Sequence, residues 1–451
     1  MKRGILFLLV VSLCRIYGWA QSIEGYWGGE LDVQGMKLGL FFDISKSGED
    51  LNAILDVPAQ GASGIKVAKT TFDGFNIRMD ISSIPAKFEG TLLNGIIGGT
   101  FSQNGITLPL ILSRKEKMQI KRPQEPKPPF PYRQEEVKFR NEREGITLAG
   151  TLTMPEGKER CPAVVLITGS GSQNRDEEMY FHKPFAVIAD YLTRNGIAVL
   201  RYDDRGVGDS ERGKVGATTL DLSYDAEAAV DFLKARNGFT HVGVAGHSEG
   251  GMISFMLSER KMVDFVISLA GPSVKGTEIL IAQQDSLFRL SGMPQKALDT
   301  NMALFKELYS IINNSETVEV ARPAIESLTS MLPEEARREL NEQFLVPWMF
   351  FFCKYDPAHS IASTTCPVLV LNGTKDMQVI ASQNITAYRE IISNNPNAKF
   401  EIHVLPGLNH LFQHCTTGHT SEYGQIEETI SPEVLEIMKT FILTQTTSAG
   451  S

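Results

Sequence analysis

The sequence predicts an α/β fold, with a mostly parallel sheet covered by helices on both faces, and a small all-β unit before it. Two observations predict this. Between residues 22 and 113, short alternating apolar segments are separated by Gly, Asn and Asp. After a Pro-rich stretch, short continuous apolar segments alternate with amphipathic helical stretches, which is the pattern of strands buried on both faces of a parallel sheet. At 451 residues the chain suits two or three domains.

Residues 1–20 have the pattern of a secretory signal peptide. Basic residues at 2–3 precede an apolar run over 5–13, and Gly18 and Ala20 place small residues at the −3 and −1 positions of a cleavage site. An uncleaved membrane anchor is disfavoured, because this run is too short to cross about 30 Å of hydrocarbon. We expect an exported protein, periplasmic or secreted, without stable membrane insertion.

The composition excludes some function classes. The formal net charge is −9, and no run of Lys or Arg is longer than a pair, so a nucleic-acid partner is not expected. Four widely spaced cysteines remain after residue 20, too few for a disulfide-built scaffold. The sequence leaves open a single disulfide bridge and homo-oligomerisation.

Residues 21–115 are predicted to form an antiparallel β domain, either a small barrel or a sandwich. Asp73-Gly74, Asn94-Gly95 and Asn104-Gly105 are strong signals for tight hairpin turns. Residues 116–133 contain prolines at a density that prevents helix and ladder formation, so we interpret them as a linker between domains.

Residues 134–451 are predicted to form the α/β domain. Six short apolar runs read as strands: 163–167, 198–202, 242–245, 265–269, 368–371 and 400–404. The alternation breaks between about 273 and 360, where only helical patterns rich in Leu, Met and Phe occur. An insertion of this size between two strands predicts a helical cap over the carboxyl edge of the sheet. The alternative is a helical domain with no role at the site.

Gly246-His-Ser-Glu-Gly250 follows one of these strands and precedes a helix. A nucleophile on such a tight strand-to-helix turn needs small residues two positions before and after it, which the glycines supply. Ser248 is therefore the candidate nucleophile. The alternative is a structural glycine turn, which the strand-turn-helix context disfavours.

A serine hydroxyl needs a neighbouring base to accept its proton. His410 lies just beyond the last predicted strand, where a base can reach back to the serine, and His414 and His419 are its rivals. His403 is interpreted as a packing residue within the strand. A metal site made from these histidines and Glu422 matches no established ligand spacing, and we expect neither metal nor cofactor.

The base in turn needs a carboxylate that accepts its second N–H. Asp376 follows the strand at 368–371, and the order Ser248, Asp376, His410 is the order in which this type of fold uses its triad. A helix N-cap is the structural alternative for Asp376. Asp356 is the runner-up acid.

Backbone donors must stabilise the oxyanion that forms on attack. The N–H of Glu249, the residue after the nucleophile, is the first candidate. The second is expected in the loop after the strand at 163–167, with Ser170 favoured and Gly169 next. No Lys-Ser/Thr follows this Gly/Ser loop at the spacing of a phosphate-binding loop, which excludes that alternative.

Taken together, these residues resemble the α/β-hydrolase superfamily, and within it the bacterial esterases grouped with the serine aminopeptidase-like hydrolases. The resemblance rests on residues 169–176, 201–210, 246–251, 371–376 and 406–410, and it covers about residues 135–440. It implies that 203–210 is a structural turn beside the site and not a catalytic element. The β region is similar to the small domain that precedes the catalytic domain in some of these esterases.

The leading hypothesis is a carboxylesterase that works through an acyl-enzyme, with a small-molecule ester as substrate. The resemblance implies acyl chains of short to medium length. A peptidase with the same triad is the alternative, and it would need carboxylates for a substrate ammonium group, with Asp176, Glu177, Glu178 and Glu249 as candidates. An acyltransferase, or a binding protein on an inert hydrolase scaffold, remains as a further hypothesis.

Overall fold

The computed structural model describes residues 22–33, 36–48, 50–58, 62–82, 84–103, 105–116, 121–158, 160–394 and 399–447. The chain divides into two compact units. The smaller unit comprises residues 1–57 and 63–118, and the larger comprises 58–62 and 119–451. The predicted signal peptide, residues 1–20, lies outside the described residues.

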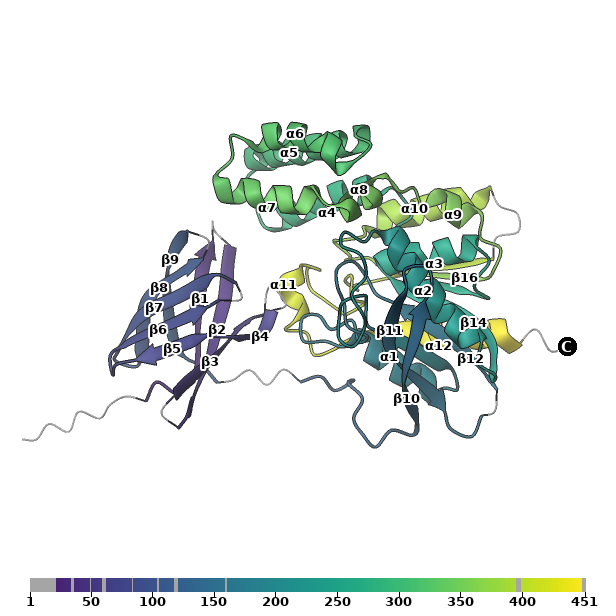
Figure 1. Cartoon of the computed structure of the whole chain (residues 1–451), viewed down its shortest axis with the longest axis horizontal. Helices are drawn as coiled ribbons and strands as arrows, with labels where there is room; N and C mark the ends of the chain where they lie inside the picture. Colours follow the sequence, from purple (N-terminus) through teal and green to yellow (C-terminus); the bar gives the residue numbers. More distant parts are fainter. Residues whose placement is uncertain are drawn as a thin grey trace, which may run out of the picture. The chain divides into compact units, whose positions relative to one another are not determined.

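The smaller unit is an antiparallel β-barrel (Figure 1). Its strands run in the order β2-β1-β9-β8-β7-β6-β5-β3-β4, and an additional pairing between β2 and β3 closes the sheet. The strands are β1 (Gly25–Val33), β2 (Met36–Ser47), β3 (Asp50–Val57), β4 (Ala62–Lys66), β5 (Lys69–Phe72), β6 (Asn76–Ile81), β7 (Ala86–Leu93), β8 (Ile96–Gln103) and β9 (Ile106–Arg114). The predicted all-β unit is confirmed, and of the two predicted forms it is the barrel.

Alternation of side chains explains the barrel. Every second residue of β6 is buried, and Trp27, Phe42 and Phe88 fill the interior at 0% exposure. The turn between β7 and β8 has positive φ at both Asn94 (52°) and Gly95 (80°), as a tight hairpin turn requires.

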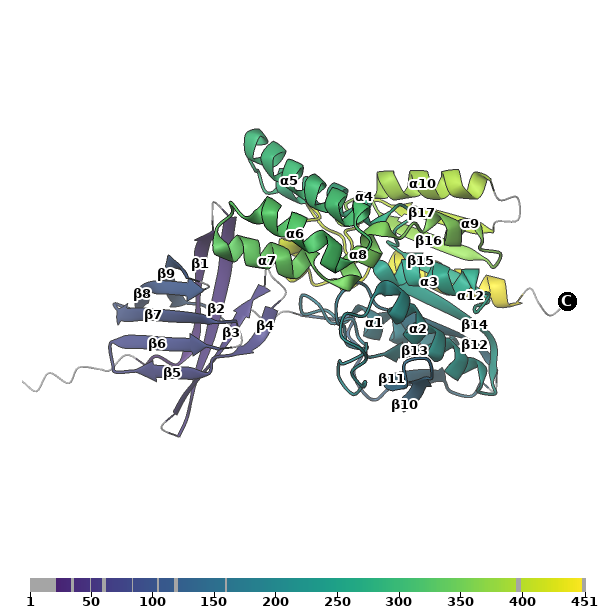
Figure 2. The same cartoon turned by 45° about the horizontal axis from the view of Figure 1, so that its top comes forward.

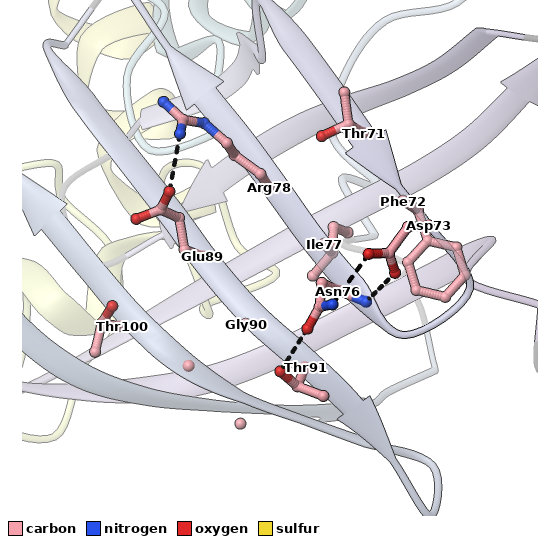
Figure 3. A pocket seen from close by; sticks show the side chains of 12 residues that line it. Thr71, Phe72, Asp73, Asn76, Ile77, Arg78, Glu89, Gly90, Thr91 and Thr100 are labelled. Atoms are coloured by element: carbon pink, nitrogen blue, oxygen red, sulfur yellow. Dashed lines mark hydrogen bonds and ion pairs between the residues drawn. The ribbon is translucent and has the colours of Figure 1, made fainter.

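The outer face of strands β5 to β8 carries a pocket of about 600 Å³ (Figure 3). Several of its polar side chains are paired with one another. Arg78 binds Glu89 at 3.0 Å, and Asn76 binds both Asp73 at 3.0 Å and Thr91 at 2.9 Å. The charged side chains of this surface are therefore paired within it.

The larger unit is built on an eight-stranded sheet with the order β10-β11-β13-β12-β14-β15-β16-β17. The first two strands are antiparallel to their neighbours, and the pairs from β13 to β17 are parallel. The strands are β10 (Tyr132–Asn141), β11 (Ile146–Pro155), β12 (Cys161–Ile167), β13 (Ala198–Tyr202), β14 (Phe239–His247), β15 (Val266–Leu269), β16 (Val368–Gly373) and β17 (Phe400–Leu405).

Helices cover both faces of this sheet, as the sequence predicts. One face packs against α2 (Thr219–Lys234), α3 (Glu249–Glu259) and α10 (Ala381–Ser393). The other packs against α1 (Pro184–Arg194) and α12 (Pro432–Thr447). Strands β12, β13, β15 and β16 are buried along their whole length, which explains their continuous apolar sequences.

Between β15 and β16 the chain forms a helical layer that we call the cap. It contains α4 (Gly276–Leu290), α5 (Gln295–Asn314), α6 (Val318–Thr329), α7 (Glu334–Phe344), α8 (Pro347–Lys354) and α9 (Ala358–Ala362). Figure 2 shows α5, α6 and α7 side by side. The cap has its own core around Tyr309, Phe344 and Phe350.

The segment interpreted as a linker, 116–133, differs from a free connection. Arg122 donates to the carbonyl oxygens of Gly424 at 2.7 Å and Ile426 at 2.6 Å. Gln124 accepts from the amide of Thr429 at 2.6 Å. Residues 121–131 therefore lie against the larger unit, close to the short helix α11 (Thr420–Tyr423). Residues 121–131 contain turns and bends, and proline density did not predict the hydrogen bonds of Arg122 and Gln124.

The structure also bears on the expectations about membrane insertion and disulfide bridges. Within the described ranges, no helix combines the length and apolarity needed to cross a membrane. Cys161, Cys353, Cys366 and Cys415 all have free thiols.

Candidate active site

Ser248 lies on the sharp turn between β14 and α3. Its φ of 53° and ψ of −118° are unusual for a residue with a side chain. The turn is held by the Ser248 amide, which donates to Leu269 O at 2.8 Å, and by the Gly251 amide, which donates to Ser248 O at 2.9 Å. A strained serine backbone between a strand and a helix is typical of the turn that carries a nucleophile.

The glycines of the turn are sterically required. A Cβ on Gly246 would lie 1.9 Å from the carbonyl oxygen of Gly250, and one on Gly250 would lie 2.2 Å from Ile167 O. Both are backbone contacts that cannot give way. Only glycine therefore allows β14, the turn and β12 to approach this closely.

Asp376 and His410 form a buried pair. His410 Nδ1 lies 2.8 Å from Asp376 Oδ2, and both side chains are almost fully buried. The other oxygen of Asp376 accepts from the amides of Gln378 at 2.8 Å and Val379 at 2.9 Å. Asp376 thus organises its own turn and also orients the imidazole, whereas the N-cap position of α10 is Ile380.

The carboxyl ends of neighbouring strands bring these groups together. Ser248 follows β14, Asp376 follows β16 and His410 follows β17, and parallel strands end at one edge of a sheet. Ser248 and His410 both line one cavity of about 490 Å³. The cap contributes the apolar side chains of Ile279, Leu280, Trp348 and Phe352 to its wall.

The aromatic segment at 348–352 has two roles. Trp348 and Phe352 stack with ring centroids 5.0 Å apart and line the cavity. Phe350 is buried in the core of the cap. The cap therefore contributes to the site, which the alternative of a helical domain without a role did not expect.

The loop after β12 lies beside Ser248. A Cβ on Gly169 would be 3.2 Å from the Cβ of Ser248, and Gly169 and Ser170 both line the cavity. The Gly169 amide already donates to Glu177 Oε1 at 2.7 Å. Of the two candidates in this loop, Gly169 is therefore engaged elsewhere, and Ser170 remains.

The segment 201–210 anchors this loop. Asp204 accepts from Thr168 Oγ1 and from the Gln173 amide, each at 2.9 Å. Asp203 accepts from the guanidinium of Arg175 at 2.6 Å. Two adjacent carboxylates thus hold both ends of the loop that carries the candidate oxyanion donors.

Glu249 follows Ser248, the candidate nucleophile, and is buried at 1% exposure. Its Oε1 accepts from Thr219 Oγ1 at 2.5 Å and from the indole of Trp348 at 2.8 Å. Burial raises the pKa of Glu249, against the hydrogen bonds, which lower it. Its amide lies in the first turn of α3, where backbone N–H groups have no partner within the helix.

The rival residues lie in other environments. His414 pairs with Glu428 at 2.9 Å and His419 with Ser421 at 2.8 Å. Asp356 is half-exposed, with Lys275 at 3.8 Å. His403, expected to be a packing residue, is instead partly exposed and binds Glu401 at 2.6 Å.

The three histidines of the metal hypothesis do not converge, since each has a different partner. Glu422 accepts from Thr417 Oγ1 at 2.7 Å instead of facing them. Among the residues that the structure describes, no group of three or more His, Cys, Asp or Glu side chains is arranged to hold a metal ion.

Comparison with known families gives a match to the same region. Residues 182–319 match the family model described as serine aminopeptidase, S33. The match spans strands β13 to β15, the Ser248 turn and the first helices of the cap. The larger unit has the α/β-hydrolase fold. The predicted fold class is confirmed.

Similar proteins include esterases. Esterase EstD of Thermotoga maritima is 31% identical over 273 residues, which cover 58% of this chain and 58% of that protein. The alignment thus spans little more than half of the relative. Among solved structures, Est1E of Butyrivibrio proteoclasticus with bound ferulic acid is 18% identical, with a TM-score of 0.42, covering 69% of this chain and 99% of that one. The Pyrococcus furiosus esterase Pf2001 is 16% identical, with a TM-score of 0.44 and coverages of 73% and 97%.

The sequence did not predict the contacts that Glu177 and Trp348 make in the candidate site. Glu177 was considered as a ligand for a substrate ammonium group, yet it is buried at 1% exposure and binds His247. Trp348 lines the cavity and also binds Glu249. The signal that could have indicated the Glu177 contact is His247, because a buried histidine needs a polar partner.

Proposed function

We propose that this chain is an exported serine carboxylesterase that acts on small esters through an acyl-enzyme. The observation that carries the proposal is the strained Ser248 turn opening into the same cavity as His410, whose imidazole is fixed by Asp376. A nucleophile, a base and an orienting acid at one sheet edge are the requirements of acyl transfer. The similarity to Esterase EstD supports the proposal.

In the proposed reaction, Ser248 Oγ attacks the ester carbonyl while His410 Nε2 takes the hydroxyl proton. Asp376 stabilises the imidazolium that forms. His410 then gives the proton to the departing alcohol, and the acyl group stays on Ser248. Water, deprotonated by His410, attacks the acyl-enzyme and releases the acid and the serine hydroxyl.

The oxyanion of both tetrahedral intermediates is assigned to the amides of Glu249 and Ser170. Glu249 is at the N-terminus of α3, where the helix dipole favours negative charge. Ser170 is held beside Ser248 by the loop that Asp203 and Asp204 anchor. Backbone donors fixed before the reaction need no reorganisation when charge develops.

The cavity favours neutral substrates of modest size. Its wall combines the apolar side chains of the cap with Pro272 and Val379, and its polar part includes Gln173, Gln283 and Gln378. At about 490 Å³ it suits acyl chains of short to medium length. Glu178 is the one carboxylate among the lining residues, and its charge gives an anionic substrate no favourable contact.

An aminopeptidase is the second candidate, because the matched family carries that description. Such an enzyme needs free carboxylates for the substrate's ammonium group. Glu177 and Glu249 are buried in hydrogen bonds, and Asp176 is paired with Arg201. Glu178 alone reaches the cavity. One partly exposed carboxylate is a weak ammonium site, and this favours the esterase.

Initial rates on p-nitrophenyl butyrate and on an aminoacyl p-nitroanilide, for wild type and Ser248→Ala, test the proposal. We expect fast ester cleavage that is lost in the variant, with a negligible anilide rate. Comparable anilide cleavage would replace the esterase by a peptidase. If neither substrate is cleaved, a transferase or a binding protein would be favoured.

A further inference from the structure

A second buried pair lies directly behind the proposed triad. Glu177 is 1% exposed and His247 is 5% exposed, and Glu177 Oε1 lies 2.9 Å from His247 Nδ1. The same oxygen accepts from the Gly169 amide at 2.7 Å. On the far side of the ring, His247 Nε2 lies 3.0 Å from the backbone carbonyl oxygen of His410. The pair therefore connects the oxyanion loop with the backbone of the base.

Counting donors and acceptors shows that the pair holds one proton between its two facing atoms. The His410 carbonyl can only accept, so His247 Nε2 must carry a proton. The Gly169 amide can only donate, so Glu177 Oε1 must accept from it. The remaining contact, between His247 Nδ1 and that same oxygen, then needs a proton as well. Burial lowers the pKa of His247, but the charge and the hydrogen bond of Glu177 raise it overall, which favours an imidazolium facing a carboxylate.

We propose that the Glu177–His247 ion pair positions two parts of the active site for the reaction. It fixes the oxyanion loop relative to the backbone of the proposed base, His410. This inference rests on the proposed esterase function. Neither side chain takes part in the chemistry. Glu177 acts through Gly169 on the neighbouring Ser170 amide, and His247 acts through the backbone of His410.

The position of Glu177 supports this role. Its backbone has a φ of 49°, which is unusual outside glycine. The residues before it are tied down by ion pairs, Arg175 with Asp203 and Asp176 with Arg201. A strained backbone anchored by the two residues before it directs a single carboxylate oxygen at the Gly169 amide.

Glu177→Gln removes the charge while keeping the shape. Without a carboxylate, the buried His247 loses one proton and can donate from one nitrogen only. If the new side-chain amide turned its NH₂ group toward the ring, that group would oppose the Gly169 N–H. Every orientation of this amide thus loses one of the three hydrogen bonds.

The test compares Glu177→Gln with Glu135→Gln, using p-nitrophenyl butyrate and an active-site titration with a phosphonate. Glu135 is a matched carboxylate in an ion pair with Arg236 at 2.8 Å, on the edge strand β10. We expect kcat per titrated site to fall about 10- to 100-fold in Glu177→Gln with KM within about 3-fold. Glu135→Gln should retain wild-type kcat.

A double-mutant cycle with His247→Asn separates positioning from general destabilisation. If the pair acts as a unit, the double variant should lose no more kcat than the more damaged single variant. Independent, multiplicative losses would overturn the inference. So would a lowered melting temperature in Glu177→Gln with unchanged kcat per titrated site, because this is the result of a purely structural role.

Nitrogen NMR of histidine-labelled wild type keeps the inference testable if the variants do not fold. The expected spectrum shows one buried imidazole with protons on both nitrogens near neutral pH. A His247 ring with one protonated nitrogen would overturn it. Wild type without Ser248-dependent ester cleavage would remove the proposed function and this inference together, whereas an active wild type beside an unaffected Glu177→Gln would remove the inference alone.

Discussion

The indole nitrogen of Trp348, in cap helix α8, donates to the carboxylate of Glu249 at 2.8 Å. Glu249 directly follows Ser248, so one side chain joins the cap to the turn that holds the nucleophile. Thr219, at the start of α2, donates to the same oxygen at 2.5 Å. The position of the cap and the geometry of the turn are therefore coupled through a buried carboxylate.

Replacing Trp348 by Phe should weaken substrate binding more than turnover. The variant keeps an aromatic wall but loses the hydrogen bond, which contributes about 1–2 kcal/mol to the position of the cap. We expect KM to rise about 3- to 10-fold with kcat within about 3-fold. Phe351→Leu, on the same helix but outside the cavity lining, is the control. Equal KM values for the two variants would contradict the coupling.

Asp376→Asn should nearly abolish turnover. An asparagine can still accept from the Gln378 and Val379 amides, but it no longer stabilises the imidazolium of His410. The expected loss in kcat is about 10³- to 10⁴-fold. Asp356→Asn is the matched control, because Asp356 is the half-exposed rival acid. Loss of activity in Asp356→Asn with an active Asp376→Asn would reverse the assignment.

His410→Ala should cost several orders of magnitude in kcat while leaving the fold intact. His414→Ala should retain activity, since His414 binds Glu428 on the surface. Circular dichroism checks the fold, and initial rates on p-nitrophenyl butyrate check turnover. Near-normal rates for His410→Ala would move the base to His414 or His419.

Asp204 should make stability depend on pH. Burial raises the pKa of Asp204 from 3.8 to about 7, and the hydrogen bonds from Gln173 and Thr168 offset this only in part. A carboxyl whose pKa is higher in the folded state stabilises the fold fully below about pH 4. That stabilisation is lost as the pH rises through about 7. The shift corresponds to at most about 4 kcal/mol.

Asp204→Asn should remove this dependence, because asparagine keeps an acceptor for the Gln173 amide and has no charge. Urea unfolding of both proteins at pH 5 and pH 8 measures the difference. Wild type should lose more stability than the variant between these values. Asp209→Asn, at an exposed position, should behave as wild type. Parallel losses in wild type and Asp204→Asn would contradict the prediction.

The exported protein should begin at Gln21. Gly18 and Ala20 satisfy the small-residue positions of the cleavage site, and a bulky residue at Ala20 should block processing. N-terminal sequencing of protein from the periplasm or medium checks this for wild type and Ala20→Tyr. A retained Met1 on cytoplasmic protein would exclude export by this segment.

Much of the candidate site could be predicted, because its members follow strands. Ser248, Asp376 and His410 each lie just after a short apolar run, and parallel strands place such positions at one edge. The glycines of the Ser248 turn are visible in sequence because backbone contacts below 2.5 Å exclude any other residue. Local rules thus identify where the groups lie.

The remaining contacts depend on packing between distant segments. Glu177 precedes its partner His247 by 70 residues. It lies between two other acidic residues, Asp176 and Glu178, in a run that is typical of an exposed surface. Trp348 lies 99 residues beyond Glu249. No periodicity encodes such pairs. Their engagement, which removes two carboxylates from the cavity, follows only from the folded arrangement.

The most direct test of the central assignment is covalent labelling with diethyl p-nitrophenyl phosphate followed by peptide mapping. Wild type should carry one diethylphosphoryl group on Ser248 and lose its ester activity in proportion. Ser248→Ala should stay unlabelled, and His410→Ala should label much more slowly. A label on another residue, or ester cleavage that persists in fully labelled protein, would contradict Ser248 as the nucleophile.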